Sequence, residues 1–190
     1  MAEFHYEMKV PKERVAVLIG KAGETKRLIE KSTKTKLNID SKEGDITVDG
    51  EDALGLFSTK DIITAIGRGF NPDIALLLLK PDYGFEVIQI GDFIKSKSSA
   101  QRIRGRIIGE QGKARRVIEE LTECNISILG KTICIIGDVQ HIPMARRAIE
   151  SLLGGSPHAN VYRWLERQRA KMKSIPFGTD LSNSEESKDI

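Results

Sequence analysis

Cysteine, histidine and aromatic residues are all scarce in this chain of 190 residues, which has two cysteines, three histidines and 5% aromatic residues. Cys124 and Cys134 do not form a close Cys-x-x-Cys pair, so we expect neither a disulfide framework nor a zinc site. No apolar run has the roughly 20 residues of a membrane-spanning helix, and the first residues lack the apolar segment of a signal peptide. We therefore expect a cytoplasmic protein that contacts no membrane and holds neither a metal ion nor a cofactor.

Groups that would serve catalysis are missing as well. The sequence has no recognisable nucleophile–base set and no carboxylate cluster with the spacing of metal ligands. Gly112-Lys113 does not belong to a P-loop, because Ile107 stands where the first glycine is needed and Ala114 replaces the Ser or Thr. The sequence therefore predicts a binding protein and not an enzyme.

Basic residues outnumber acidic ones only slightly, but they are unevenly placed. The net charge is +3, with 30 Lys and Arg against 27 Asp and Glu. The stretch 176–190 holds four acids and one base, and we expect it to be a disordered tail. By contrast, Lys9 to Lys36 has nine bases and three acids, and Lys95 to Arg116 has eight bases and one acid. Such clusters are typical of a surface that binds an anionic partner.

The chain contains an internal repeat. When the sequence is shifted by 89 residues, Val15 to Thr33 falls on Arg104 to Thr122. The identical positions are Ile19/Ile108, Gly20/Gly109, Gly23/Gly112, Arg27/Arg116, Ile29/Ile118, Glu30/Glu119 and Thr33/Thr122. A repeat of this kind indicates two copies of one structural unit.

Each copy has the hydrophobic pattern of the same six elements. Strand-like alternation at Phe4, Tyr6, Met8 and Val10 is followed by two helical patterns, a pair of short strands and a third helix, in the order β-α-α-β-β-α. The first unit is expected to have these elements at 4–10, 11–19, 24–34, 37–39, 46–48 and from 52. The second is expected to have them at 85–90, up to 108, up to 123, 125–129, 132–136 and 139–153.

One more helix is predicted after the second unit. Ser156-Pro157 can start it, and Val161, Trp164 and Leu165 follow at helical spacing. We therefore expect a first domain with a linker helix over 1–80, a second domain with a C-terminal helix over 81–175, and the acidic tail over 176–190.

The two Gly-x-x-Gly elements, Ile19-Gly20-Lys21-Ala22-Gly23 and Ile108-Gly109-Glu110-Gln111-Gly112, resemble the loop of KH domains. One such element is common by chance, but two, each between helices and followed by a hairpin and a helix, are specific. The resemblance implies an α+β fold of two tandem eukaryotic-type KH domains, each with a three-stranded antiparallel sheet packed against three helices. It also implies that the partner is single-stranded RNA.

Elementary chemistry supports phosphate binding at these loops. Glycines let a phosphate approach the backbone, and the second helix presents its positive N-terminal end. A KH loop holds the backbone of about four nucleotides while the bases lie in the neighbouring groove. The expected RNA-binding residues are Gly20, Lys21, Ala22, Gly23, Lys26, Arg27, Arg102, Arg104, Arg106, Gly109, Glu110, Gln111, Gly112, Lys113, Arg115 and Arg116. The expected aliphatic floor of the groove is Val17, Leu18, Ile39, Ile107 and Ile128.

Two features depart from the usual KH pattern. KH loops normally carry a base between the glycines, as at Lys21, but the second loop has Glu110-Gln111, whose carboxylate repels phosphate. The sequence therefore leaves open whether the second loop contacts phosphate. Where KH domains have an aliphatic residue three positions past the second glycine, both units have a base, Lys26 and Arg115, which predicts a shared modification of the groove.

A finer resemblance lies in the second unit. The segments Arg106–Glu119, Thr132–Gly137 and Met144–Gly155, together with Val161-Tyr162, are similar to archaeal members of the family named for the partner of the Nob endonuclease. This resemblance implies a role in pre-rRNA processing and small-subunit ribosome assembly, with binding near the 3′ end of small-subunit rRNA beside other assembly or translation factors. Two alternatives stay open: a general single-stranded RNA- or DNA-binding regulator of the KH class, and a scaffold whose KH units contact protein.

Overall fold

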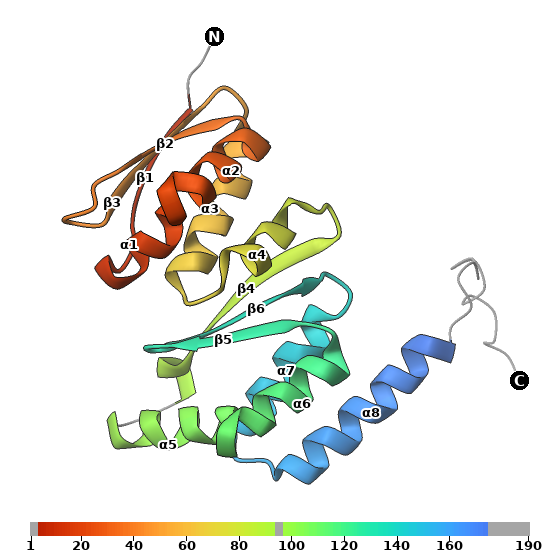
Figure 1. Cartoon of the computed structure of the whole chain (residues 1–190). Coiled ribbons are helices and arrows are strands. Elements are labelled where there is room, and N and C mark those ends of the chain that lie inside the picture. The colour runs from red at the N-terminus through yellow and green to blue at the C-terminus, as the bar shows by residue number, and fades with distance from the viewer. Residues whose placement is uncertain (1–3, 94–96, 175–190) are drawn as a thin grey trace, which may run out of the picture.

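The structure is a computed structural model that describes residues 4–93 and 97–174, and the acidic tail expected at 176–190 lies outside this part. It contains two units with the same order of elements (Figure 1). The first unit consists of β1 (Phe4–Lys9), α1 (Lys12–Ile19), the 3-10 turn η1 (Lys21–Gly23), α2 (Glu24–Thr33), β2 (Thr35–Ile39), β3 (Asp45–Gly50) and α3 (Ala53–Gly67). The second consists of β4 (Tyr83–Gln89), η3 (Ile90–Phe93), α5 (Lys97–Ile108), η4 (Glu110–Gly112), α6 (Lys113–Thr122), β5 (Asn125–Leu129), β6 (Thr132–Asp138) and α7 (Ile142–Leu153). The predicted α+β class with two KH-type units is confirmed.

Each unit has one antiparallel sheet of three strands, with the last strand in the middle. The strand order is β1-β3-β2 in the first unit and β4-β6-β5 in the second. Val48 of β3 lies opposite both Tyr6 and Leu37, and Ile136 of β6 lies opposite both Phe85 and Asn125. One face of each sheet is covered by the three helices of its own unit.

The core of the first unit follows from the alternation of its strands. Ile46 and Val48 are buried against Leu18 of α1 and Ile29 of α2. Asp45, Thr47 and Asp49, which alternate with them on β3, are polar and lie on the opposite face of the sheet, where Asp45 forms an ion pair with Lys9. This sheet therefore has one buried face and one exposed, charged face.

The second sheet is buried on both faces. Ile133 and Ile135 of β6 belong to the core formed with α5, α6 and α7. Cys134 and Ile136, which point the other way, pack into the core of the first unit. The contact is extended by Ser127, whose Oγ donates to the carbonyl of Arg68 at 2.9 Å. Strand β6 therefore supplies side chains to two hydrophobic cores, one on each face, and the core of the first unit contains residues of both units (the shared core).

Segments that follow each unit cover its helices. The first unit is followed by α4 (Pro72–Ala75) and the 3-10 turn η2 (Leu76–Leu79), and η2 packs against α2 and α3. The predicted C-terminal helix is α8 (His158–Ser174), which packs against α6 and α7 through Val161 and Leu165. Trp164 packs against the same core, and the guanidinium of Arg147 lies 5.0 Å from the centre of its ring.

Candidate nucleic-acid interface

The two Gly-x-x-Gly loops have the same backbone conformation. Gly20 and Gly109 have φ of 75° and 72°, with ψ of 177° in both. The third loop residue, Ala22 or Gln111, lies in the left-handed region with φ of 50° in each case. Because the loops differ at both middle positions, the shared backbone indicates a shared requirement.

The first glycine of each loop is required by close packing inside the protein. A β-carbon on Gly20 would lie 2.8 Å from the amide nitrogen of Thr25, and one on Gly109 would lie 2.7 Å from that of Ala114. Both glycines also have a positive φ that side chains rarely adopt. This glycine therefore shapes the turn, in addition to leaving room for a ligand.

The second glycine of each loop begins the second helix. Gly23 and Gly112 are the N-cap residues of α2 and α6, both in the left-handed region, and neither helix start has a side-chain cap. Helix α3 differs, because Asp52 accepts hydrogen bonds from the N–H groups of its first turn. The uncapped first turns of α2 and α6 are suited to an anion such as phosphate.

The charges around the two loops are exchanged between two positions. The first unit has Lys21 in the loop and Glu24 at the start of α2, whereas the second has Glu110 in the loop and Lys113 at the start of α6. All four side chains are exposed. The second unit therefore keeps a basic residue, Lys113, in the first turn of the helix that follows its loop, although the loop itself carries the acidic Glu110.

An arginine stands beside the second glycine in each unit. Arg116 donates a hydrogen bond to the carbonyl of Gln111. Arg27 has its Nη1 3.2 Å from the place where a β-carbon on Gly23 would lie. Both arginines are exposed, so each helix start is flanked by a guanidinium group.

Lys26 and Arg115, the basic residues three positions past the second glycine, belong to a network that both units repeat. Lys26 Nζ lies 3.9 Å from Glu30, and Arg115 Nε lies 3.6 Å from Glu119. Each glutamate also accepts a hydrogen bond of 2.8 Å from a backbone N–H of the edge strand, β2 or β5. The sequence repeat showed that Glu30 and Glu119 are equivalent, but it did not predict that they bind the edge strands. Their recurrence in both units was the only sign of this role in the sequence.

The three expected arginines of α5 lie in different surroundings. Arg102 is exposed and lines a hollow between α5 and the turn that follows α7. Arg104 donates to the carbonyl of Gly130 at 3.0 Å. Arg106 donates to the carbonyl of Gly155 at 3.0 Å and to the next carbonyl in the turn. Arg106 therefore ties α5 to the start of α8, a structural role that the sequence did not indicate.

The predicted groove floor needs a correction. Leu18 and Ile107 have no exposed surface, because each faces the sheet from the first helix of its unit, so neither can touch a ligand. Val17, Ile39 and Ile128 are half-buried and pack at the edge of the cores. Only these three of the five expected floor residues present atoms at the surface.

Within residues 4–93 and 97–174, no group of three or more His, Cys, Asp and Glu side chains could hold a metal ion. In the same part of the chain, no helix is both long and apolar enough to cross a membrane.

Comparison with protein families matches both units. A family model described as a eukaryotic-type KH domain (type I) matches residues 84–170, and the KH domain model matches residues 5–69. A KH domain-containing protein of Methanocaldococcus jannaschii is 47% identical over 174 residues, which are 90% of this chain and 76% of that protein. The pre-rRNA-processing protein PNO1 of Candida albicans is 37% identical over 116 residues, but these are only 60% of this chain and 42% of the relative.

Two crystal structures from Pyrococcus horikoshii are similar over nearly their full length. Dim2p has 46% identity and a TM-score of 0.80, covering 86% of this chain and 99% of that one. The chain matched in the a/eIF2alpha–aDim2p–rRNA complex has 45% identity and a TM-score of 0.83, covering 89% and 96%. On these similarities, the chain belongs to the tandem KH-domain family of archaeal Dim2p and PNO1.

Proposed function

We propose that this chain binds single-stranded RNA through both Gly-x-x-Gly loops. The observation that carries the proposal is the shared loop backbone, which opens onto an uncapped helix start in each unit. Exposed lysine and arginine side chains flank both helix starts. Half-buried aliphatic side chains lie nearby, and the nucleobases of the RNA can pack against them. Phosphate contacts are assigned to the loop glycines and to the flanking bases Lys21, Arg27, Lys113 and Arg116.

The RNA that we propose is the 3′ region of small-subunit rRNA. Dim2p of Pyrococcus horikoshii was crystallised with rRNA and a/eIF2alpha, and PNO1 relatives are named for pre-rRNA processing. By analogy, this chain acts in the cytoplasm during ribosome assembly, beside an assembly or translation factor, and catalyses no reaction. Its working parts are the two KH domains over 1–80 and 81–175.

Crosslinking in cells, followed by sequencing of the attached RNA, tests the proposed target. We expect the crosslinks to concentrate near the 3′ end of small-subunit rRNA. Crosslinks spread over many messenger RNAs would instead support the general KH regulator, and a chain that attaches to no RNA would support the protein scaffold.

Glu110 gives specific support to a second possibility, that the second unit faces a protein while the first alone holds RNA. Replacing Glu110 by Lys separates the two. If phosphate lies at this loop, Glu110→Lys strengthens RNA binding modestly, because a repulsion is removed. If the second unit faces a protein, the same substitution leaves the affinity for RNA unchanged.

A further inference from the structure

Helix α8 lies along α6 and is fastened to its unit at both ends. At its start, the ring Nε2 of His158 lies 2.9 Å from the carbonyl oxygen of Arg106, in the helix that leads into the second loop. Near its end, Arg169 Nη2 lies 3.4 Å from Glu123, the residue that follows α6. These two contacts show that α8 runs in the same direction as α6. Val161 and Leu165 are buried between them, so one face of α8 is fixed inward.

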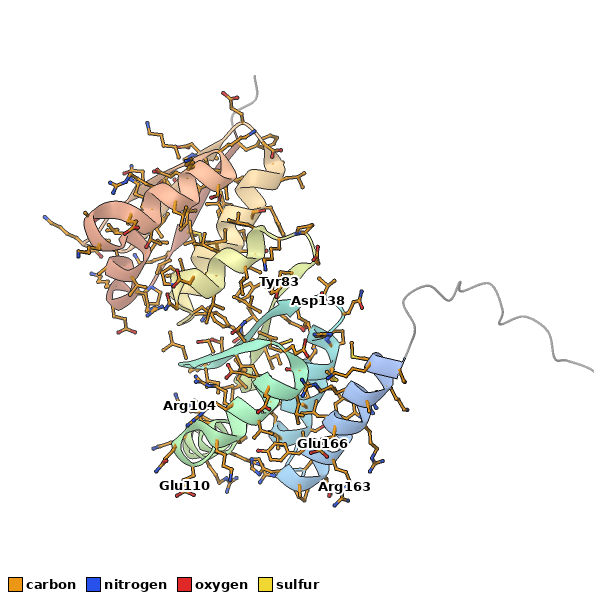
Figure 2. The ribbon with its side chains drawn as sticks, turned by 45° about the vertical axis from the view of Figure 1, so that its right-hand side comes forward. Tyr83, Arg104, Glu110, Asp138, Arg163 and Glu166 are labelled. Carbon is orange, nitrogen blue, oxygen red and sulfur yellow. The ribbon has the colours of Figure 1, made fainter. Side chains whose placement is uncertain are left out.

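The outward face of α8 carries a row of basic side chains. Arg163, Arg167 and Lys171 are exposed and follow one another at intervals of four residues, so they lie along one side of the helix. None of the three forms an ion pair with another described residue, and Glu166 is the single exposed acid among the described residues of α8. Figure 2 shows Arg163 and Glu110 at the same end of the second unit.

Helix stability does not account for this row. Like charges four residues apart repel each other along a helix and destabilise it. The helix dipole favours bases only in the last turn, where Lys171 and Lys173 lie, and it does nothing for Arg163 or Arg167. A feature that opposes local stability in this way is best explained by a ligand.

A hollow beside the second loop carries charges of both signs. Lys113 and Arg116 of α6 line it together with Glu110 and Gln111 of the loop, and so does the exposed Glu120, one turn further along α6. An RNA strand that crosses this hollow can pair its phosphates with Lys113 and Arg116, at the end of α6 that adjoins the loop.

We propose that the outward face of α8 is a second phosphate-binding surface, which continues the path of RNA beyond the second loop. Arg163, Arg167 and Lys171 contact the backbone of nucleotides that lie outside the KH groove, without reading their sequence. This inference rests on the proposed function, because it requires RNA at the second loop. It predicts that the RNA bound is longer than the two loops alone would hold.

The test compares two RNAs and two triple variants in the full chain. One variant is Arg163→Gln/Arg167→Gln/Lys171→Gln, and the matched control, Lys31→Gln/Lys34→Gln/Lys36→Gln, removes the same charge from exposed positions of the first unit. Affinities are measured across a salt series for a single strand of about 20 nucleotides and for one of about 12, the length that two KH loops and a spacer hold. Nuclease protection of the longer strand gives the length of the bound segment.

We expect the α8 variant to bind the long RNA more weakly, with a salt slope lower by about 2, from three phosphates at about 0.7 each. The protected segment should shorten, while binding of the short RNA stays close to that of the unmodified protein, which also shows that the variant is folded. The control should change neither the protected length nor the difference between the two RNAs.

Two results overturn the inference. One is an α8 variant that binds the long RNA with unchanged slope and footprint, which would leave the row free for an acidic protein. The other is an equal loss for both RNAs and both variants, which would reduce the effect to net charge. If the unmodified chain binds neither RNA, the proposed function itself fails, and that outcome is distinct from both.

Discussion

At the scale of single residues, the two glycines of each loop have different duties that the sequence cannot distinguish. Gly20 and Gly109 are fixed by the backbone that lies against them, whereas the space beside Gly23 and Gly112 is bounded by the end of a flexible arginine. The repeat predicted that all four glycines matter, and it predicted the loops themselves. Which glycine serves the fold and which faces a ligand depends on distances between atoms that are five residues apart.

Substitutions at the second loop should separate these duties. Gly109→Ala should lower the free energy of unfolding by about 1–3 kcal/mol, because it combines a steric clash with a strained backbone. Gly112→Asp should cost less stability, since Asp tolerates the left-handed region, yet it should weaken RNA binding by placing a carboxylate at the helix start. Denaturant unfolding and RNA titration measure the two effects, and equal stability losses in the two variants would contradict the assignment.

The cysteines give a second prediction at this scale. Burial raises the pKa of Cys124 and of Cys134 to about 11 in each case. Since only the thiolate reacts, and it forms as the pH rises toward the pKa, both thiols should resist iodoacetamide at about pH 8 in the native protein. Mass spectrometry should show alkylation of both cysteines once denaturant is added. Rapid labelling of either cysteine in the native protein would contradict its burial.

At the scale of elements, each unit has its second and third helices covered by the segment that follows it in the chain. In the first unit this segment is η2, which packs on α2 and α3, and in the second it is α8, which packs on α6 and α7. The sequence predicted α8 from Pro157 and the spacing of Val161, Trp164 and Leu165. It predicted a linker helix after the first unit, but not the helices against which this segment packs, because the place where a short linker docks depends on tertiary contacts.

Helix α8 should therefore be an integral part of the second unit. Leu165 is fully buried, so Leu165→Ala should lower the free energy of unfolding by about 2–5 kcal/mol through lost burial and a cavity. Glu166→Ala, on the exposed face of the same helix, is the matched control and should change stability by less than about 0.5 kcal/mol. A Leu165→Ala variant as stable as this control would show that packing of α8 contributes little to the stability of the second unit.

At the scale of the whole molecule, the shared core joins the two units. Its signal was present in the sequence, since Ile133-Cys134-Ile135-Ile136 is apolar without interruption, as expected of a strand buried on both faces. The corresponding strand of the first unit alternates, and its sheet has one exposed face. The sequence nevertheless could not say what covers the second face of β6, because hydrophobicity predicts burial and not the identity of the neighbour.

The shared core predicts that both units unfold together. The single tryptophan, Trp164, reports on the second unit by fluorescence, while far-ultraviolet circular dichroism reports on both. We expect coincident transitions by the two methods. Ile136→Ala, which opens a cavity between the units, should shift both transitions to lower denaturant by the same amount. Two separate transitions would show that the units are energetically independent.

Both loops are proposed to bind the phosphate backbone of one RNA strand. Phosphate binding at both loops is tested most directly by the affinity of an RNA of about 12 nucleotides, long enough for two loops and a spacer, for the unmodified chain, Gly23→Asp, Gly112→Asp and the double variant. We expect each single variant to bind more weakly and with a lower salt slope, and the double variant not to bind measurably. A Gly112→Asp variant that binds as tightly as the unmodified chain, with the same slope, would contradict phosphate binding by the second loop.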